Sequence, residues 1–155
     1  MGPGKKVLIL GMGNPILTDD GVGLHIVRSL KGKIQNVETL TTPLVGLNIL
    51  DQLNGYDLLF LVDALISEKN SIGSIKKLTT GEGTLHLFTS HGIDFFELME
   101  LGRKLGLTMP EVGAVYAVEI ENPISFGKEL TPSLSEKLPA LIESITKDIQ
   151  LCLMC

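Results

Sequence analysis

The sequence predicts a three-layer α/β domain in which helices cover both faces of a mostly parallel, mixed sheet of about five strands with one antiparallel strand. Short apolar runs alternate along the chain with segments of helical periodicity, and this alternation is typical of parallel sheets. One pair of neighbouring apolar runs is too close in sequence for a helical crossover, which predicts the antiparallel strand. The length of 155 residues fits one domain, so we expect a single domain over 1–155.

The first half of the chain predicts three strands and two helices. An apolar run at 7–10 ends at a glycine-rich turn, and this pattern indicates a central strand. Apolar residues at helical spacing predict a first helix that begins at Asp19 or Asp20 and stops at Gly32. The remaining elements are a strand at 37–41, a helix at 44–53 and the most apolar strand, at 58–62.

The second half predicts two further strands and two helices. The next strand, roughly 73–78, follows the apolar strand after about ten residues, and this short connection favours the antiparallel arrangement. Thr131 and Pro132 precede a long periodic segment and are typical of a helix start. The other elements are a helix at 92–105, a strand at 112–120 and a final helix at 131–151.

Composition and charge exclude several classes of protein. Lys and Arg number 13 and Asp and Glu 18, and the resulting net charge of −5 argues against a nucleic-acid-binding surface. Hydrophobic residues make up 44%, which excludes a disordered chain. No run approaches the roughly 18 apolar residues of a membrane span, no signal peptide is recognisable, and the only cysteines are Cys152 and Cys155. We therefore expect a cytoplasmic monomer with neither nucleic-acid nor membrane partners.

The loop after the first strand has a Gly-x-Gly pattern at 11–13, which invites a dinucleotide-binding interpretation. Ile16 stands where the fingerprint requires its third glycine, and Asp19 and Asp20 place negative charge where a phosphate would dock. Nucleotide binding is therefore disfavoured but stays an alternative. A helix N-cap role accounts for Thr18 or Asp19, but two adjacent acids are more than one cap requires.

Asp63 follows the most apolar strand, at a place where an isolated carboxylate is costly to bury. The carboxyl ends of parallel strands form the ligand crevice of such sheets, and the loop that holds Asp20 follows another strand of this kind. We therefore expect Asp20 and Asp63 to face one crevice. The alternative role for a carboxylate in this position is to cap a loop or accept backbone N–H groups.

His91 lies in a polar turn before a predicted helix, in the third loop expected at this end of the sheet. Two carboxylates and one imidazole suit zinc, nickel or another divalent metal and leave positions open for substrate or water. Their spacing matches no local metal motif, so spacing alone leaves the question open. His25, on the first helix, and His86, between two leucines, are interpreted as solvated or core-edge side chains.

Together these motifs resemble those of the hydrogenase maturation endopeptidases, which remove a C-terminal extension from the large subunit of nickel–iron hydrogenases. The resemblance covers most of the chain, and the order and separation of its segments are specific. The segments are Gly11-x-Gly13-Asn14, Asp19-Asp20-Gly21-x-Gly23, Leu61-Val62-Asp63-Ala64, Ser90-His91-Gly92, Glu119 and Phe126-Gly127-x-x-Leu130-Thr131-Pro132. The segment at 41–46 departs from the Asp-Gly-Gly-Thr-like turn of many relatives, which leaves the identity of the hydrogenase open.

The resemblance implies a function and a set of site residues. The two acids and the histidine that bind metal in the family fall on Asp20, Asp63 and His91, which we expect to be the metal ligands and the catalytic residues. The metal would be nickel already carried by the hydrogenase large-subunit precursor, with zinc or another divalent ion able to take its place. Asp19 is a candidate general base, and an N-cap role is equally consistent with its position.

Two other classes of function remain open at this stage. A non-catalytic nickel-binding maturation chaperone would use the same three ligands for storage or delivery, and a nucleotide-binding α/β module would use the glycine-containing loop. A general two-metal aminopeptidase is disfavoured, because three converging ligands are fewer than such sites need.

Overall fold

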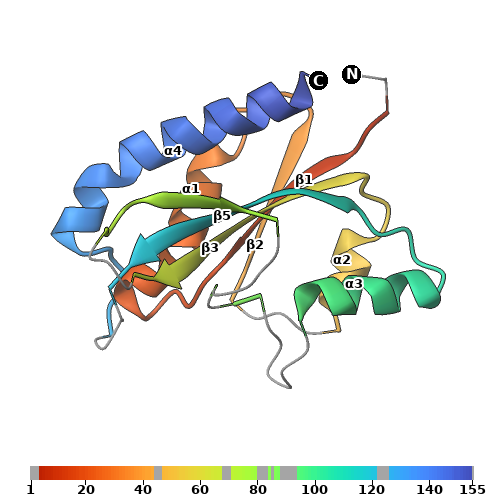
Figure 1. Ribbon diagram of the computed structural model, residues 1–155, viewed down its shortest axis with the longest axis horizontal. Coiled ribbons are helices and arrows are strands. Elements are labelled where there is room, and N and C mark those ends of the chain that lie inside the picture. The colour runs from red at the N-terminus through yellow and green to blue at the C-terminus, as the bar shows by residue number, and fades with distance from the viewer. Residues whose placement is uncertain are drawn as a thin grey trace.

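The computed structural model describes residues 4–43, 47–67, 71–79, 84, 86–87, 94–121 and 126–154. Within these residues five strands form one sheet in the order β2-β1-β3-β5-β4 (Figure 1). All neighbouring strands run parallel except β4 and β5. The strands are β1 (Val7–Met12), β2 (Val37–Thr42), β3 (Leu58–Ile66), β4 (Ile75–Leu78) and β5 (Glu111–Ile120). The predicted mixed sheet with one antiparallel strand is confirmed.

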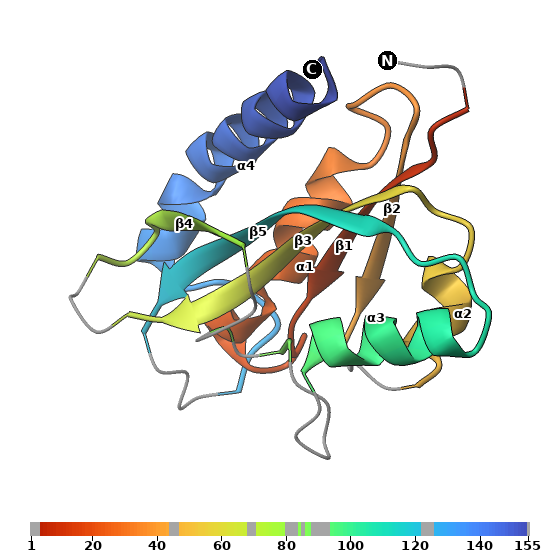
Figure 2. The same cartoon turned by 45° about the vertical axis from the view of Figure 1, so that its right-hand side comes forward.

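Helices cover both faces of the sheet, which gives the three predicted layers. The helices α1 (Val22–Leu30) and α4 (Pro132–Leu153) lie on one face, while α2 (Ile49–Leu53) and α3 (Phe95–Lys104) lie on the other, as Figures 1 and 2 show. None of the helices in the described ranges has both the length and the apolar character that crossing a membrane would require.

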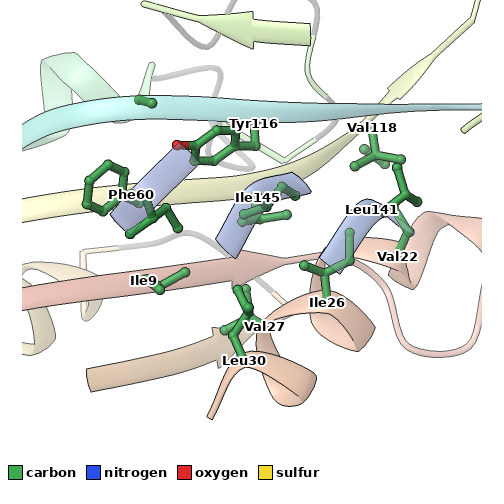
Figure 3. Packing of buried hydrophobic residues seen from close by; sticks show 14 of the residues in the cluster. Ile9, Val22, Ile26, Val27, Leu30, Phe60, Tyr116, Val118, Leu141 and Ile145 are labelled. Carbon is green, nitrogen blue, oxygen red and sulfur yellow. The ribbon is translucent and has the colours of Figure 1, made fainter. Parts of the chain in front are cut away.

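The central strands separate two hydrophobic cores because successive side chains of a strand point to opposite faces. Ile9 and Phe60 join α1 and α4 in one core (Figure 3), whereas Leu8 and Leu61 join α2 and α3 in the other. Every residue of β1 is buried. Strands that are covered on both faces read as continuous apolar runs, which explains why the sequence shows these strands so clearly.

The helices match the predicted segments, with shorter bounds in three cases. The first helix was expected from Asp19 or Asp20, but a 3-10 helix, η1 (Thr18–Gly21), comes before α1. The helix expected at 44–53 is α2, a little over one turn long, and part of its predicted start lies outside the described residues. The start expected at 92 for α3 also lies outside them. Thr131 is the N-cap of α4, with proline in the first turn, as predicted.

The end of β3 differs from the prediction in a way that matters for function. The strand was expected to stop at 62, just before Asp63, but it continues to Ile66 because β5 pairs with it as far as Ile120. On the other side, β1 pairs with β3 only as far as Val62. Asp63 therefore lies inside a strand, at the point where the neighbour on one side is lost.

The glycines of the first loop allow unusually close backbone packing. A Cβ on Gly23 would lie 2.5 Å from the carbonyl oxygen of Met12 and 2.6 Å from that of Val62. A Cβ on Gly13 would lie 2.5 Å from the carbonyl oxygen of Asp20. The first turn of α1 thus packs directly against the ends of β1 and β3, and this contact brings Asp20 close to Asp63.

Candidate functional site

Beyond the point where β1 stops pairing with β3, a short segment from later in the chain lies beside the last residues of β3 in its place. Thr84 forms an antiparallel bridge with Leu65. Continuing this register by two residues places His86 directly opposite Asp63. Leu87 is buried in the core beside α3, and its carbonyl oxygen accepts the backbone N–H of Phe95 at 2.9 Å. Both sides of His86 are therefore anchored, and its side chain lies at the end of β3.

Asp63 is fully buried, and both of its carboxylate oxygens are engaged. Oδ2 accepts the backbone N–H of His86 at 2.7 Å. Oδ1 lies 2.7 Å from Nδ1 of the His86 ring and accepts the backbone N–H of Ala64 at 2.8 Å. These contacts supply the partners that a carboxylate in an apolar strand requires.

Asp20 reaches the same imidazole from the opposite side. Its position is set by η1, and its Oδ2 accepts the backbone N–H of Asn14 at 2.9 Å. The same oxygen lies 3.0 Å from Nε2 of His86. The two carboxylates therefore converge on a single ring, which has 18% of its side-chain surface exposed, against 5% for Asp20.

The electrostatics of this triad favour a positively charged imidazole. Burial opposes the charge on His86, but hydrogen bonds and Coulomb attraction from Asp20 and Asp63 outweigh it and raise the pKa of the ring to about 10. Burial raises the pKa of the Asp63 carboxyl, and the hydrogen bonds from His86 oppose that increase. With a proton on each ring nitrogen, the imidazolium can donate to both carboxylates at once.

Asp19 points away from this triad and serves a structural role. Its Oδ1 accepts the backbone N–H of Thr131 at 2.7 Å, and its Oδ2 accepts the Thr131 hydroxyl at 2.8 Å. The expectation that Asp19 caps its own helix is wrong, because it instead fixes the residue before α4. The two adjacent acids thus have separate roles: Asp19 binds the residue before α4, and Asp20 faces the site.

The backbone of the first loop is already hydrogen-bonded to the protein itself. The N–H of Asn14 donates to Asp20 and that of Thr18 to Gly127, the latter at 2.9 Å. The N–H groups of Ile16 and Leu17 both donate to Asn14, at 3.1 and 3.3 Å. A phosphate-binding loop needs such groups free to face its ligand, so these bonds count against the nucleotide-binding alternative.

The structure brings together two of the three predicted site residues. Asp20 and Asp63 converge as expected, whereas His91 lies outside the described residues, so its role as a ligand stays a prediction. In the part of the chain that is described, no three acidic, histidine or cysteine side chains are arranged to hold a metal ion. The ring of His86 lies between the two carboxylates instead.

His86 lies at the edge of the core, which is one of the two environments expected for it, but its two carboxylate partners were not predicted. Its flanking leucines gave no hint of a charged partner, because the contact depends on a bridge between Thr84 and Leu65 that is distant in sequence. One available signal was the presence of a histidine two residues beyond Thr84 in an otherwise apolar stretch. That signal becomes useful only when the antiparallel register is known.

Two curated proteins are similar to this chain over most of its length. No protein-family model matches the chain. The hydrogenase 2 maturation protease of Escherichia coli (strain K12) is 29% identical over 160 residues, covering 90% of this chain and 92% of that protein. The hydrogenase expression/formation protein HupD of Thiocapsa roseopersicina is 26% identical over 145 residues, covering 89% of this chain and 65% of that protein.

Solved structures show the same fold. The hydrogenase maturating endopeptidase HybD from Escherichia coli superposes with a TM-score of 0.67 at 23% identity, covering 94% of this chain and 92% of that one. The NiFe hydrogenase maturation protease HybD from Thermococcus kodakarensis gives a TM-score of 0.66 at 23% identity, covering 92% of this chain and 97% of that one.

Proposed function

We propose that this chain, which is similar to hydrogenase maturation proteases over most of its length, acts as a member of that family and removes the C-terminal extension of a nickel–iron hydrogenase large-subunit precursor once nickel has been inserted. The observation that carries the proposal is the convergence of Asp20 and Asp63 at the carboxyl edge of the sheet. That edge is where open α/β sheets bind their ligands. We further propose that the protein works as a cytoplasmic monomer.

The proposed substrate carries its own metal, and the site residues recognise it. Asp20 would contribute Oδ2 and Asp63 would contribute Oδ1, the two oxygens that face the His86 ring. His91 would supply an imidazole nitrogen. Carboxylate and imidazole ligands suit nickel and also zinc or another divalent ion, so such an ion in the precursor could be recognised in the same way.

The residues of this chain position the precursor for hydrolysis. Asp20 and Asp63 are held by the backbone N–H groups of Asn14 and Ala64, so both carboxylates are oriented before any substrate arrives. Carboxylates held in this way would bind the substrate's metal and so bring the scissile peptide beside it. The metal would supply Lewis-acid activation of the carbonyl or of a bound water. Asp19 is not proposed as the base, because both of its oxygens bind Thr131.

The test is cleavage of a matched pair of precursors. Purified protein is incubated with a nickel-loaded and with a nickel-free large-subunit precursor, and the mass of each precursor is followed. We expect loss of a C-terminal peptide only from the loaded form. Cleavage of both forms would contradict recognition through the metal. Cleavage of neither form, together with stoichiometric nickel binding by the folded protein, would favour the non-catalytic chaperone.

Site variants assign the roles of individual residues. Asp20→Asn, Asp63→Asn and His91→Gln should each leave the loaded precursor uncleaved, because each removes one expected ligand. His25→Gln is a matched control, since His25 lies on α1 and is not a member of the proposed ligand set. A fully active His91→Gln protein would remove that residue from the ligand set.

A further inference from the structure

The ring of His86 lies where a metal ion would have to bind both carboxylates. Its Nε2 is 3.0 Å from Asp20 Oδ2 and its Nδ1 is 2.7 Å from Asp63 Oδ1. A divalent ion ligated by these two oxygens would need the space that the ring fills, because metal–oxygen bonds are about 2.0–2.2 Å long. Ring and metal therefore cannot occupy the site together in this arrangement.

We propose that His86 is a displaceable internal counter-ion that competes with free metal ions for Asp20 and Asp63, which weakens their binding, and gives way to metal presented by the precursor. This inference rests on the proposed function of the two carboxylates as metal ligands. It adds a specificity-determining residue to that site. Free hydrated ions would have to displace the ring unaided, whereas a bound precursor contributes its whole interface to the exchange.

The surrounding contacts allow the ring to leave without dismantling the site. The backbone N–H of His86 bonds to Asp63 Oδ2, and this bond does not depend on the position of the ring. Ala64 and Asn14 continue to hold Asp63 and Asp20 through their own N–H groups. The buried side chain of Leu87 anchors the backbone next to His86. Rotation of the His86 side chain would therefore free both oxygens. The two carboxylate side chains would then have to move toward each other to share one ion, because two metal–oxygen bonds of about 2.0–2.2 Å span less than the ring with its two hydrogen bonds.

The first experiment measures metal affinity rather than activity. Zinc binding to the full-length protein is measured by titration calorimetry for wild type, His86→Asn and the control His25→Asn. We expect the His86→Asn protein to bind zinc about tenfold or more tightly than wild type, because the competing ring is gone. Unchanged or weaker binding by a folded His86→Asn protein would overturn the proposal. Weaker binding would identify His86 as a metal ligand.

A second measurement uses the wild-type protein, so it does not depend on the variant folding. The ring nitrogens of His86 are observed by ¹⁵N NMR while zinc is added. We expect the two hydrogen-bonded ring signals to change to those of a free ring as Asp20 and Asp63 take the metal. Ring signals typical of metal coordination, or signals that remain bridged after zinc has bound at this site, would overturn the inference.

The two proposals can fail separately. Nickel-dependent cleavage of the precursor together with a His86 ring that never moves would retain the proposed function and reject the counter-ion. Displacement of the ring by zinc without any precursor cleavage would retain the counter-ion and reject the proposed function.

Discussion

His86 contacts the carboxylate of Asp63 twice, through its backbone N–H to Oδ2 and through ring Nδ1 to Oδ1, each at 2.7 Å. The backbone contact fixes the orientation of the carboxylate, and the ring contact balances its charge. Because Nε2 of the same ring reaches Asp20, one side chain links strand β3 to the loop that begins the first helix. The stability and the chemistry of this edge of the sheet are therefore coupled.

The charge on His86 should make stability depend on pH in the alkaline range. The ring pKa rises from an ordinary 6.5 to about 10 in the folded protein. A raised folded-state pKa means that the stabilising contribution is complete below pH 6.5 and is lost as pH rises toward 10. Urea unfolding between pH 6 and pH 10 should show this decline for wild type and a smaller decline for His86→Asn. Equal pH profiles for the two proteins would contradict a charged bridge.

The protonation state itself can be observed directly. Histidine NMR titration should show His86 charged throughout the neutral range, because its pKa lies near 10. A midpoint for His86 near its ordinary value of 6.5 would show that the carboxylates do not hold the proton on the ring.

The bonds between Asp19 and Thr131 should stabilise the start of α4 without serving catalysis. Asp19→Ala removes both acceptors and leaves the Thr131 N–H and hydroxyl to find other partners. The expected loss is about 1.5–3 kcal/mol in the free energy of unfolding, as for hydrogen bonds to charged groups. Denaturant unfolding measures the loss, and hydrogen exchange should show faster opening at the first turn of α4.

Precursor cleavage distinguishes the structural role of Asp19 from the role of Asp20 in the site. Asp19→Asn, which keeps one acceptor oxygen, should still cleave the loaded precursor under conditions where it is folded. A folded Asp19→Asn protein without activity would return Asp19 to the list of candidate bases.

Gly23 should tolerate no side chain. An added Cβ would come within 2.5 and 2.6 Å of two backbone carbonyl oxygens that cannot turn aside, so α1 would have to move away from β1 and β3. Gly23→Ala should therefore lose at least about 2 kcal/mol of stability, toward the upper part of the range for overpacking. Thermal unfolding checks this, with the exposed Arg28→Ala on the same helix as the control. A Gly23→Ala protein as stable as the control would refute the close-packing explanation.

The anchor of α4 on β5 should weaken in acid. Hydrogen bonds from Lys77 and Tyr116 lower the pKa of the Asp148 carboxyl below its ordinary 3.8. Because its pKa is lowered in the folded protein, the Asp148 carboxylate stabilises the folded state above pH 3.8, and this contribution is lost as the pH falls below that value. Comparing acid unfolding of wild type and Asp148→Asn measures the effect, and Glu143→Gln, at an exposed position of the same helix, is the matched control. The control should unfold like wild type, and an unchanged acid profile for Asp148→Asn would exclude the anchor.

The fold was largely predictable because strands buried on both faces leave continuous apolar runs in the sequence. The run at 58–62 marked β3 and the periodic segment from Thr131 marked α4, each from local spacing alone. The end of β3 could not be predicted in this way. Its extension through Asp63 depends on pairing with β5, which lies more than forty residues further along the chain.

The candidate site was predictable in its acids and not in its histidine. Asp20 follows β1 and Asp63 lies near the carboxyl end of β3, two strands whose parallel arrangement could be inferred, so their convergence followed from the general geometry of α/β sheets. His86 gave no comparable signal, because its neighbours in sequence are leucines and its partners are both distant. Asp19 and Asp20 are adjacent acids in the sequence, and only their hydrogen bonds distinguish the one that fastens Thr131 from the one that faces the site.

By itself, the sequence determined the order of the elements, the parallel character of the sheet and the two carboxylates at its edge. These features depend on local periodicity and on the burial of apolar side chains, which are properties of short segments. Only the tertiary structure decided which side chain lies between those carboxylates. The bridge between Leu65 and Thr84 sets that register, and a register between distant segments is fixed by packing rather than by either segment alone.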